Sequence, residues 1–170
     1  SSSYYEAVCY VTEKGLMNGT SASTFSPDAA MTRAMMVTIL WRMEKEPAAL
    51  KSNFTDLTAD WYRTAVDWAA ETGVVNGVGN GKFAPNATLS LEQLITILYR
   101  YAENKGYNVS KSASLDSFTD GSAVSAYARP AMQWAVGMNF LSGNTLTPGA
   151  PASRAQIAQV LMLFCKAYIK

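Results

Sequence analysis

Two arginines occupy positions that are unfavourable for a helix and well suited to binding an anion. Arg33, in the segment MTRAM, and Arg154, in ASRAQ, each follow a predicted N-cap residue, Thr32 or Ser153. The first helical turn carries a partial positive charge, so a cation there costs roughly a few tenths of a kcal/mol. A residue choice against local preference is a hint of function. Free N–H groups beside a guanidinium form a site for a carboxylate, which accepts two parallel hydrogen bonds.

The same arginines could instead hold the fold together. Each could pair with an acidic side chain from another part of the chain, and Asp56 and Asp120 are the candidates. An arginine and a carboxylate in such a pair would join two segments without binding any ligand. The residues alone give the two interpretations equal weight.

The composition narrows the range of functions. The 170 residues are 49% hydrophobic, which is enough for a sizeable core, and 14 basic against 13 acidic residues leave too little positive charge for nucleic-acid binding. The chain has no histidine, the commonest general base and zinc ligand, so we expect neither catalysis nor a metal or other cofactor. The apolar runs are too short to cross a bilayer and the start lacks a signal-peptide pattern. We expect a soluble protein without membrane insertion, whose export signal, if it had one, has been removed.

The two cysteines lie near opposite ends of the chain. Cys9 and Cys165 stand in apolar, helix-like contexts without a partner at metal-ligand spacing. Buried free thiols are the favoured interpretation, and a disulfide between the first and last helices is the alternative.

A repeat organises the whole chain. The segment WAAETGVVNG at 68–77 matches YVTEKGLMNG at 10–19 and, more loosely, WAVGMNFLSG at 134–143. Each is followed by an aromatic residue or leucine, one further residue and proline, and then by a second predicted helix. The segment FTD precedes the second and third copies and has no counterpart in the first. We therefore expect one domain over 1–170 that begins inside a repeat, as a fragment of a longer chain, with repeats at 1–47, 54–106 and 118–170.

Each repeat contains the signals for two helices. Gly15, Gly73 and Asn139 stand where a left-handed residue ends the first helix. The second helices carry apolar stripes with a period near 3.6, and S-x-x-Q capping boxes begin at Ser90 and Ser153. The prediction is an all-α fold with short loops or minor strands, in which three long helices form a central bundle with pseudo-threefold symmetry.

The repeats resemble S-layer homology (SLH) motifs. The shared pattern is F-x-D, a tryptophan, a glycine-ended helix, G-x-G-x-F-x-P-N and T-R-A-E; the second repeat carries FTD, Trp61, ETG and GNGKFAPN. The resemblance covers nearly the whole chain in three copies. It implies a non-catalytic domain at a bacterial cell surface or cell wall, which anchors a larger protein and has surface-layer proteins as neighbours. Its partner would be a pyruvylated, and therefore acidic, secondary cell-wall polysaccharide bound in grooves between repeats.

The resemblance also implies roles for individual residues. Arg33 and Arg154, with their caps Thr32 and Ser153, would bind the pyruvyl carboxylate. Five further residues are candidates for sugar contacts, each with a structural alternative. The aromatic residues would stack on a sugar ring or pack against the core, and the polar ones would bind hydroxyls or form turns. These candidates are Trp61, Tyr127, Asn18, Asn76 and Ser142.

The second repeat departs from the SLH pattern. Leu91 replaces the arginine and Glu92 follows it, so a carboxylate would meet a negative charge and no guanidinium. We expect the groove served by this repeat to bind weakly. The departure supports an alternative function, a self-assembly or protein-interaction module of the cell surface whose sugar grooves have decayed. A glycan-cleaving enzyme using Asp56, Glu92 or Asp120 is a third and less favoured hypothesis.

Overall fold

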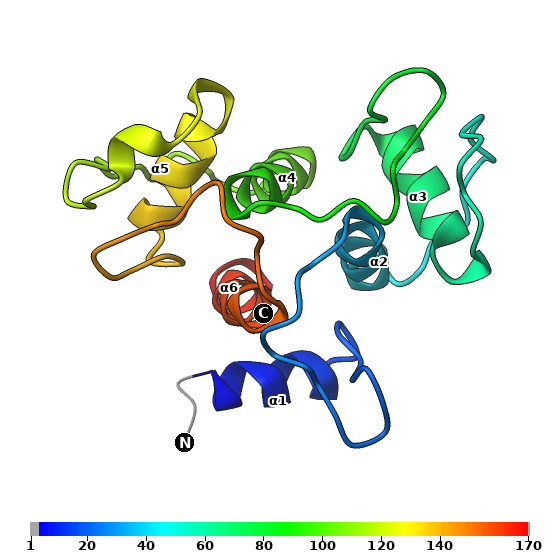
Figure 1. The fold of residues 1–170 in the computed structure, drawn as a ribbon, viewed down its shortest axis with the longest axis horizontal. Helices are drawn as coiled ribbons and strands as arrows, with labels where there is room; N and C mark the ends of the chain where they lie inside the picture. Colours follow the sequence, from blue (N-terminus) through cyan, green and yellow to red (C-terminus); the bar gives the residue numbers. More distant parts are fainter. Residues whose placement is uncertain (1–3, 170) are drawn as a thin grey trace.

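The computed structural model describes residues 4–169, and their regular structure is helical (Figure 1). The helices are α1 (Tyr5–Glu13), α2 (Arg33–Met43), α3 (Asp60–Thr72), α4 (Leu91–Asn104), α5 (Arg129–Gly137) and α6 (Arg154–Tyr168). Two short 3-10 helices, η1 (Gly121–Ala123) and η2 (Ala126–Ala128), precede α5. Extended structure within 4–169 is limited to isolated β-bridges, three between the linkers before the long helices and one within the loop at Gly79 and Lys82. The predicted all-α class is confirmed.

The predicted caps form at the N-termini of the longer helices. The hydroxyl of Thr32 accepts a hydrogen bond from the backbone of α2. Ser90 and Gln93 cap α4 reciprocally, at 3.3 and 2.9 Å, and Ser153 and Gln156 do the same for α6, at 3.1 and 2.9 Å. Each reciprocal pair satisfies two N–H groups that a helix start leaves open.

The shorter helices end as the sequence predicts. Gly15, Gly73 and Asn139 adopt positive φ values of 67, 73 and 60°, in the left-handed region that lets the chain leave a helix. The loop that follows each helix can therefore turn back toward the long helices.

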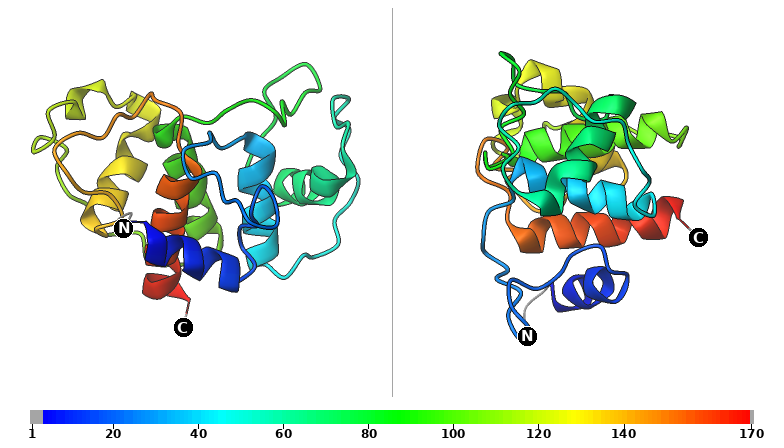
Figure 2. Two further views of the ribbon diagram at one scale, coloured as in Figure 1. Left: turned by 60° about the horizontal axis from the view of Figure 1, so that its bottom comes forward. Right: turned by 90° about the vertical axis from the view of Figure 1, so that its right-hand side faces the viewer.

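The helices that pack together come from different repeats. The long helix α2 packs against the short helix α3, α4 against α5, and α6 against α1. Figure 2 shows the three long helices running in roughly the same direction, with the short helices outside them. Each packed pair thus joins the long helix of one repeat to the short helix of the next, and the last repeat to the first. A sequence repeat is therefore not a structural unit.

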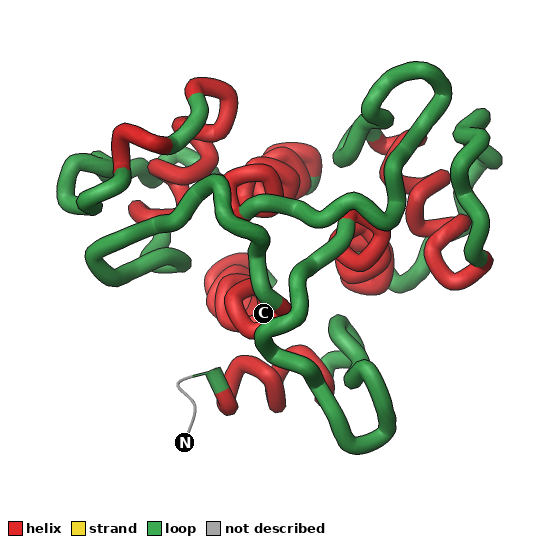
Figure 3. The backbone as a smooth tube through the Cα atoms, in the orientation of Figure 1, coloured by secondary structure: helices red, strands yellow, loops and turns green. Residues whose placement is uncertain are grey.

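Three linkers close this arrangement at the N-terminal ends of the long helices (Figure 3). The backbone N–H of Met31 donates to the carbonyl of Ala152, that of Ala152 to Leu89, and that of Leu89 to Met31, each at 2.9 Å. All three residues are buried. These bonds form a closed cycle, which we call the linker ring. The pseudo-threefold axis of the whole molecule remains a prediction.

Side chains also connect the helices away from the linker ring. Phe164 of α6 is fully buried, and its ring centroid lies 6.1 Å from that of Tyr101 and 6.4 Å from that of Trp134. The Tyr101 hydroxyl donates to the Glu44 carboxylate at 2.6 Å, which links α4 to the end of α2. Aromatic packing and this polar contact hold α4, α5 and α6 together and connect them to α2.

Two other expectations concern the cysteines and the membrane. Cys9 and Cys165 are both free, although their helices α1 and α6 pack together as the disulfide alternative required. Cys165 is buried, and this burial raises the pKa of its thiol. None of the helices within residues 4–169 combines the length and the apolar character that a bilayer span needs.

We expect Leu89→Pro to destabilise the fold more than Leu89→Ala. Truncating a buried leucine to alanine costs about 2–5 kcal/mol. Proline also removes the N–H that donates to Met31, which adds about 1–3 kcal/mol. The free energy of unfolding in urea measures both variants. Equal losses would show that the linker ring adds nothing beyond side-chain packing.

Candidate functional site: three grooves between repeats

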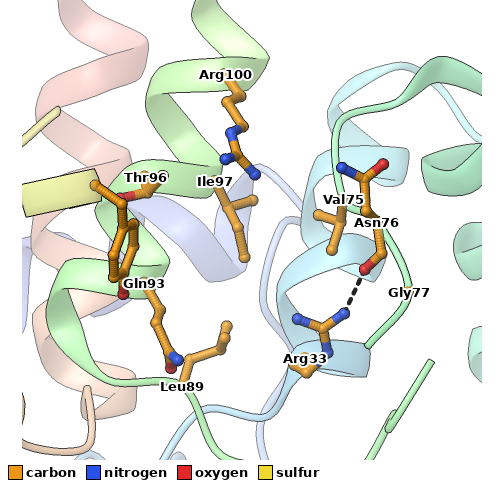
Figure 4. A pocket seen from close by; sticks show the side chains of 10 residues that line it. Arg33, Val75, Asn76, Gly77, Leu89, Gln93, Thr96, Ile97 and Arg100 are labelled. Atoms are coloured by element: carbon orange, nitrogen blue, oxygen red, sulfur yellow. Dashed lines mark hydrogen bonds between the residues drawn. The ribbon is translucent and has the colours of Figure 1, made fainter. Parts of the chain in front are cut away.

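Arg33 fastens the loop of the second repeat to the start of α2. Its Nε donates to the carbonyl of Phe83 at 2.9 Å. Its Nη2 donates to the carbonyl of Asn76 at 2.7 Å, the bond drawn in Figure 4. The guanidinium carbon lies 4.7 Å from the centroid of the Phe83 ring, within the range of a cation–π contact. Burial lowers the pKa of Arg33, and the nearby Asp56 charge partly opposes this effect. Nη1 makes no hydrogen bond to the other described residues.

Arg154 makes the same contacts one repeat away. Its Nε donates to the carbonyl of Phe25 at 2.9 Å, its Nη2 donates to the carbonyl of Asn18, and its guanidinium carbon lies 4.6 Å from the Phe25 ring. Arg154 is only 7% exposed, and burial lowers its pKa. The two arginines therefore hold the fold together, but through backbone carbonyls and aromatic rings.

The alternative interpretation, in which the arginines form ion pairs with Asp56 or Asp120, is wrong as to the partners. Neither carboxylate forms a salt bridge with an arginine among the residues described. Asp56 accepts from the backbone N–H groups of Phe83 and Ala84, at 3.0 and 2.8 Å. Asp120 accepts from the two equivalent N–H groups of the third repeat, at 2.8 and 2.7 Å. Asp56 therefore fixes the loop at Phe83, and Asp120 fixes the equivalent loop at Leu146, because only an acceptor can satisfy two converging N–H groups.

The expectation of free N–H groups at these helix starts is also wrong. The N–H groups of Arg33 and Ala34 donate to linker carbonyls of the second repeat, and those of Arg154 and Ala155 to linker carbonyls of the first, all at 2.9 Å. The next N–H in each helix is bound by the cap side chain. An anion at these sites therefore has to be bound by side chains.

Grooves lie between each arginine-fastened loop and the next long helix. Groove A has a volume of about 300 Å³, and Figure 4 shows α4 on one side of it and Arg33 with its loop on the other. Its lining is Arg33, Val75, Asn76, Gly77, Leu89, Gln93, Thr96, Ile97, Arg100 and Tyr127.

Groove B has a volume of about 410 Å³ and repeats groove A position by position. Its lining is Met17, Asn18, Gly19, Thr20, Met31, Met35, Thr38, Ile39, Arg42, Trp61 and Arg154. Every residue of groove A has its repeat equivalent here, from Arg33 with Arg154 to Tyr127 with Trp61. Two grooves with equivalent linings indicate a repeated site rather than two accidental hollows.

Groove C occupies the third equivalent place, beside α6, and has a volume of about 520 Å³. Its lining is Tyr4, Asp28, Asn139, Phe140, Leu141, Ser142, Ser153, Ala155, Gln156, Gln159, Val160 and Leu163. None of these residues is an arginine or lysine.

The grooves bring most of the sequence candidates together. Arg33, Asn76 and Tyr127 meet in groove A, and their equivalents Arg154, Asn18 and Trp61 meet in groove B. Ser142 and Ser153 line groove C. Thr32 lines none of these grooves, and it acts as the cap of α2.

The aromatic candidates are open to solvent. Trp61 is 54% exposed and Tyr127 55% exposed, each at the rim of its groove. The interpretation that they are packed against the core is therefore wrong for much of their surface. Stacking on a sugar ring stays a prediction, which this exposure permits.

Sequence reasoning missed a second pair of arginines. Arg100 projects from α4 into groove A (Figure 4), and Arg42 occupies the equivalent place in groove B, where its Nη1 donates to the carbonyl of Leu16 at 3.3 Å. Both stand ten residues after the N-cap of their helix, and Leu163 stands there in the third repeat. Comparing the repeats at this position would have found them.

Glu92 does not place a negative charge in groove C, contrary to the sequence expectation. It is 7% exposed and accepts from the backbone N–H and the hydroxyl of Ser125, at 2.9 and 2.6 Å. It also borders a separate hollow of about 350 Å³ next to groove A. Glu92 therefore fixes the segment before α5, and groove C differs from the others mainly by its missing arginines.

Comparison with known proteins identifies the family. A model of the S-layer homology domain matches residues 1–35, 53–95 and 117–158, which together cover more than half of the chain. The chain belongs to the S-layer homology domain family. The three matched segments follow the three repeats in order, and the resemblance predicted from the sequence is confirmed.

The relatives are much longer proteins. The surface-layer 125 kDa protein of Lysinibacillus sphaericus is 30% identical over 162 residues, covering 91% of this chain and 13% of its own length. An endoglucanase of Bacillus sp. strain KSM-635 is 33% identical over 156 residues, covering 88% of this chain and 16% of its own length. A cellulosome-anchoring protein of Acetivibrio thermocellus is 26% identical over 108 residues, covering 60% of this chain and 24% of its own length. This SLH chain thus spans less than a quarter of each relative.

These matches support the predicted location at the bacterial cell surface or cell wall, in a domain of the anchoring kind. The similarity to the endoglucanase lies in the SLH region and gives no evidence of catalysis in this chain.

We expect Arg33 and Phe83 to be energetically coupled. Arg33→Leu leaves two carbonyls without their donor and should lower the free energy of unfolding by about 1–3 kcal/mol. Adding Phe83→Leu recreates the pair found at groove C, Leu91 of the second repeat and Leu146 of the third, which are both buried. The double variant should therefore lose less than the sum of the single variants, by about 0.5–2 kcal/mol. Strict additivity in urea unfolding would contradict the coupling.

We also expect Asp56 and Asp120 to make the fold sensitive to acid. Burial acts to raise the pKa of Asp56, but hydrogen bonds from backbone N–H groups outweigh it and lower the pKa; backbone N–H groups likewise lower the pKa of Asp120. A lowered folded-state pKa gives stability that is present above the unfolded value of about 3.9 and is lost as the pH falls through the folded value.

Urea unfolding between about pH 7 and pH 3 tests this expectation. The variant Asp56→Asn with Asp120→Asn should be less stable at neutral pH and should lose less stability on acidification. Asp116→Asn is the control, because its exposed carboxylate accepts no hydrogen bond from the described residues. A double variant as acid-sensitive as the unchanged protein would contradict the expectation.

Proposed function

We propose that this SLH domain anchors a larger surface protein by binding pyruvylated secondary cell-wall polysaccharide in grooves A and B. The observation that carries the proposal is the presence of two arginines in each of two equivalent grooves. A pyruvyl ketal places a carboxylate on a sugar, and a guanidinium is the side chain best shaped to bind it.

The two arginines of a groove have different parts in this proposal. In groove A, Arg33 uses two nitrogens to fasten the loop, and its Nη1 remains for a ligand. Arg100 is exposed on the opposite wall. A carboxylate between the two guanidinium groups is bound by a fixed cation and a more adaptable one. Groove B offers Arg154 and Arg42, where Arg42 is half-buried and its Nη1 also donates to the carbonyl of Leu16.

The remaining lining suits the body of a sugar. Tyr127 and Trp61 supply exposed aromatic faces, and Thr96 and Gln93 are among the residues that line groove A. Aromatic faces stack on the apolar side of a pyranose, while polar side chains bind its hydroxyls. Two such grooves on one domain would engage one polymer twice, and this avidity would raise retention at the wall.

We expect Arg42→Gln with Arg100→Gln to weaken binding to cell-wall sacculi at least tenfold, because each substitution removes a charged hydrogen bond of about 1.5–3 kcal/mol. These positions disturb the fold less than Arg33 and Arg154, because Arg100 donates to none of the described residues and Arg42 makes one hydrogen bond, at 3.3 Å, whereas Arg33 and Arg154 each make two. Sedimentation with sacculi, before and after the secondary polymer is stripped, measures the effect.

The matched control is Lys51→Gln with Lys111→Gln, which removes the same charge from exposed sites outside the grooves. The control should bind as the unchanged protein does. Equal binding to stripped and intact sacculi, or an equal loss in both double variants, would rule out the proposed site.

A further inference from the structure

Groove C has a different chemistry from grooves A and B. Leu163 lines it where the others have Arg42 and Arg100, and Leu91 stands at the position of Arg33 and Arg154. Removing a carboxylate from water without a cationic partner is strongly unfavourable. A pyruvylated sugar therefore has no counter-charge here, yet this groove is the largest of the three, at about 520 Å³.

The lining of groove C includes polar groups that can bind hydroxyls. Asp28 places an exposed carboxylate there, from the linker that meets the start of α6. The side-chain oxygen of Gln156 accepts from the backbone N–H of Ser153 at 2.9 Å, and its amide N–H groups donate to none of the described residues. Gln159 lies one turn further along α6 and adds an amide donor and acceptor.

Apolar side chains also line groove C. Phe140 and Val160 are buried, and Leu141 and Leu163 are partly exposed. In groove A the position of Leu163 is taken by Arg100, so groove C has an apolar side chain where groove A has a charged one. Exposed apolar side chains of this kind gain free energy from contact with a methyl group, at about 25 cal/mol per Å².

We propose that groove C binds an uncharged sugar unit that carries an N-acetyl group. The hydroxyls of the sugar would face Asp28 and Gln156, and the acetyl methyl would lie against Leu141 and Leu163. The amide of the N-acetyl group has one donor and one acceptor, which Gln159 can match. The proposal takes its ligand class from the proposed polysaccharide function but does not depend on the arginine grooves.

The test is a titration of the 15N-labelled domain with N-acetylglucosamine, glucose and glucosamine, followed by NMR. N-acetylglucosamine should shift the backbone amide signals of Ser142, Gln159 and Leu163 and bind in the millimolar range. Glucose lacks the acetyl methyl and should bind roughly threefold to tenfold more weakly. Tighter binding of cationic glucosamine would overturn the proposal, because Asp28 would then be acting as a counter-ion.

Two variants separate this proposal from the proposed function. Gln159→Ala should weaken N-acetylglucosamine binding at least threefold, whereas Arg42→Gln with Arg100→Gln should leave it unchanged. Loss of sacculus binding in the arginine variant tests grooves A and B independently. Signals that shift in groove A or B, no shift at millimolar sugar, or an unchanged affinity in Gln159→Ala would overturn the assignment of groove C.

Discussion

The closed cycle of hydrogen bonds between the three linkers is the constraint on which the other features depend. Met31, Leu89 and Ala152 each donate to one neighbour and accept from the other, so no linker can shift without breaking bonds to both. The first N–H groups of the long helices donate to these same linkers. The first N–H groups of a helix normally donate to water or to a cap, and here they donate to backbone carbonyls of another repeat. This pairing places each loop against the next long helix and creates the grooves.

The arginines combine two tasks that the sequence presented as alternatives. Arg33 and Arg154 give two nitrogens to backbone carbonyls and lie over a phenylalanine ring. Their helix-start position, which is poor for a cation, is tolerated because linker carbonyls surround it. A guanidinium held in this way is pre-organised for a ligand, since its orientation is fixed before binding. The proposed binding site thus uses a side chain that the fold already holds in place.

Local sequence signals predicted the helices, their caps and their ends well, because these depend on residues close together in the chain. The S-x-x-Q boxes at Ser90 and Ser153 formed as expected. The pairing of helices from different repeats could not be read from the repeat, because identical repeats can pack within or across their boundaries. The role of Asp56 was missed for a related reason: its partners are backbone N–H groups 27 and 28 residues away, which carry no residue-type signal.

The third repeat shows how the fold can persist while the chemistry of a groove changes. Where the other repeats bring an arginine and a phenylalanine together, Leu91 and Leu146 are both buried in the apolar core. Two leucines exclude water there without needing a hydrogen-bond acceptor or a charge, so the loop stays in place although the cation is gone. The linker ring consists of backbone hydrogen bonds, so replacing the arginine and the phenylalanine by leucines does not remove any of them. A linker ring made of backbone bonds therefore allows each groove to have its own side chains, and the three grooves need not bind the same sugar.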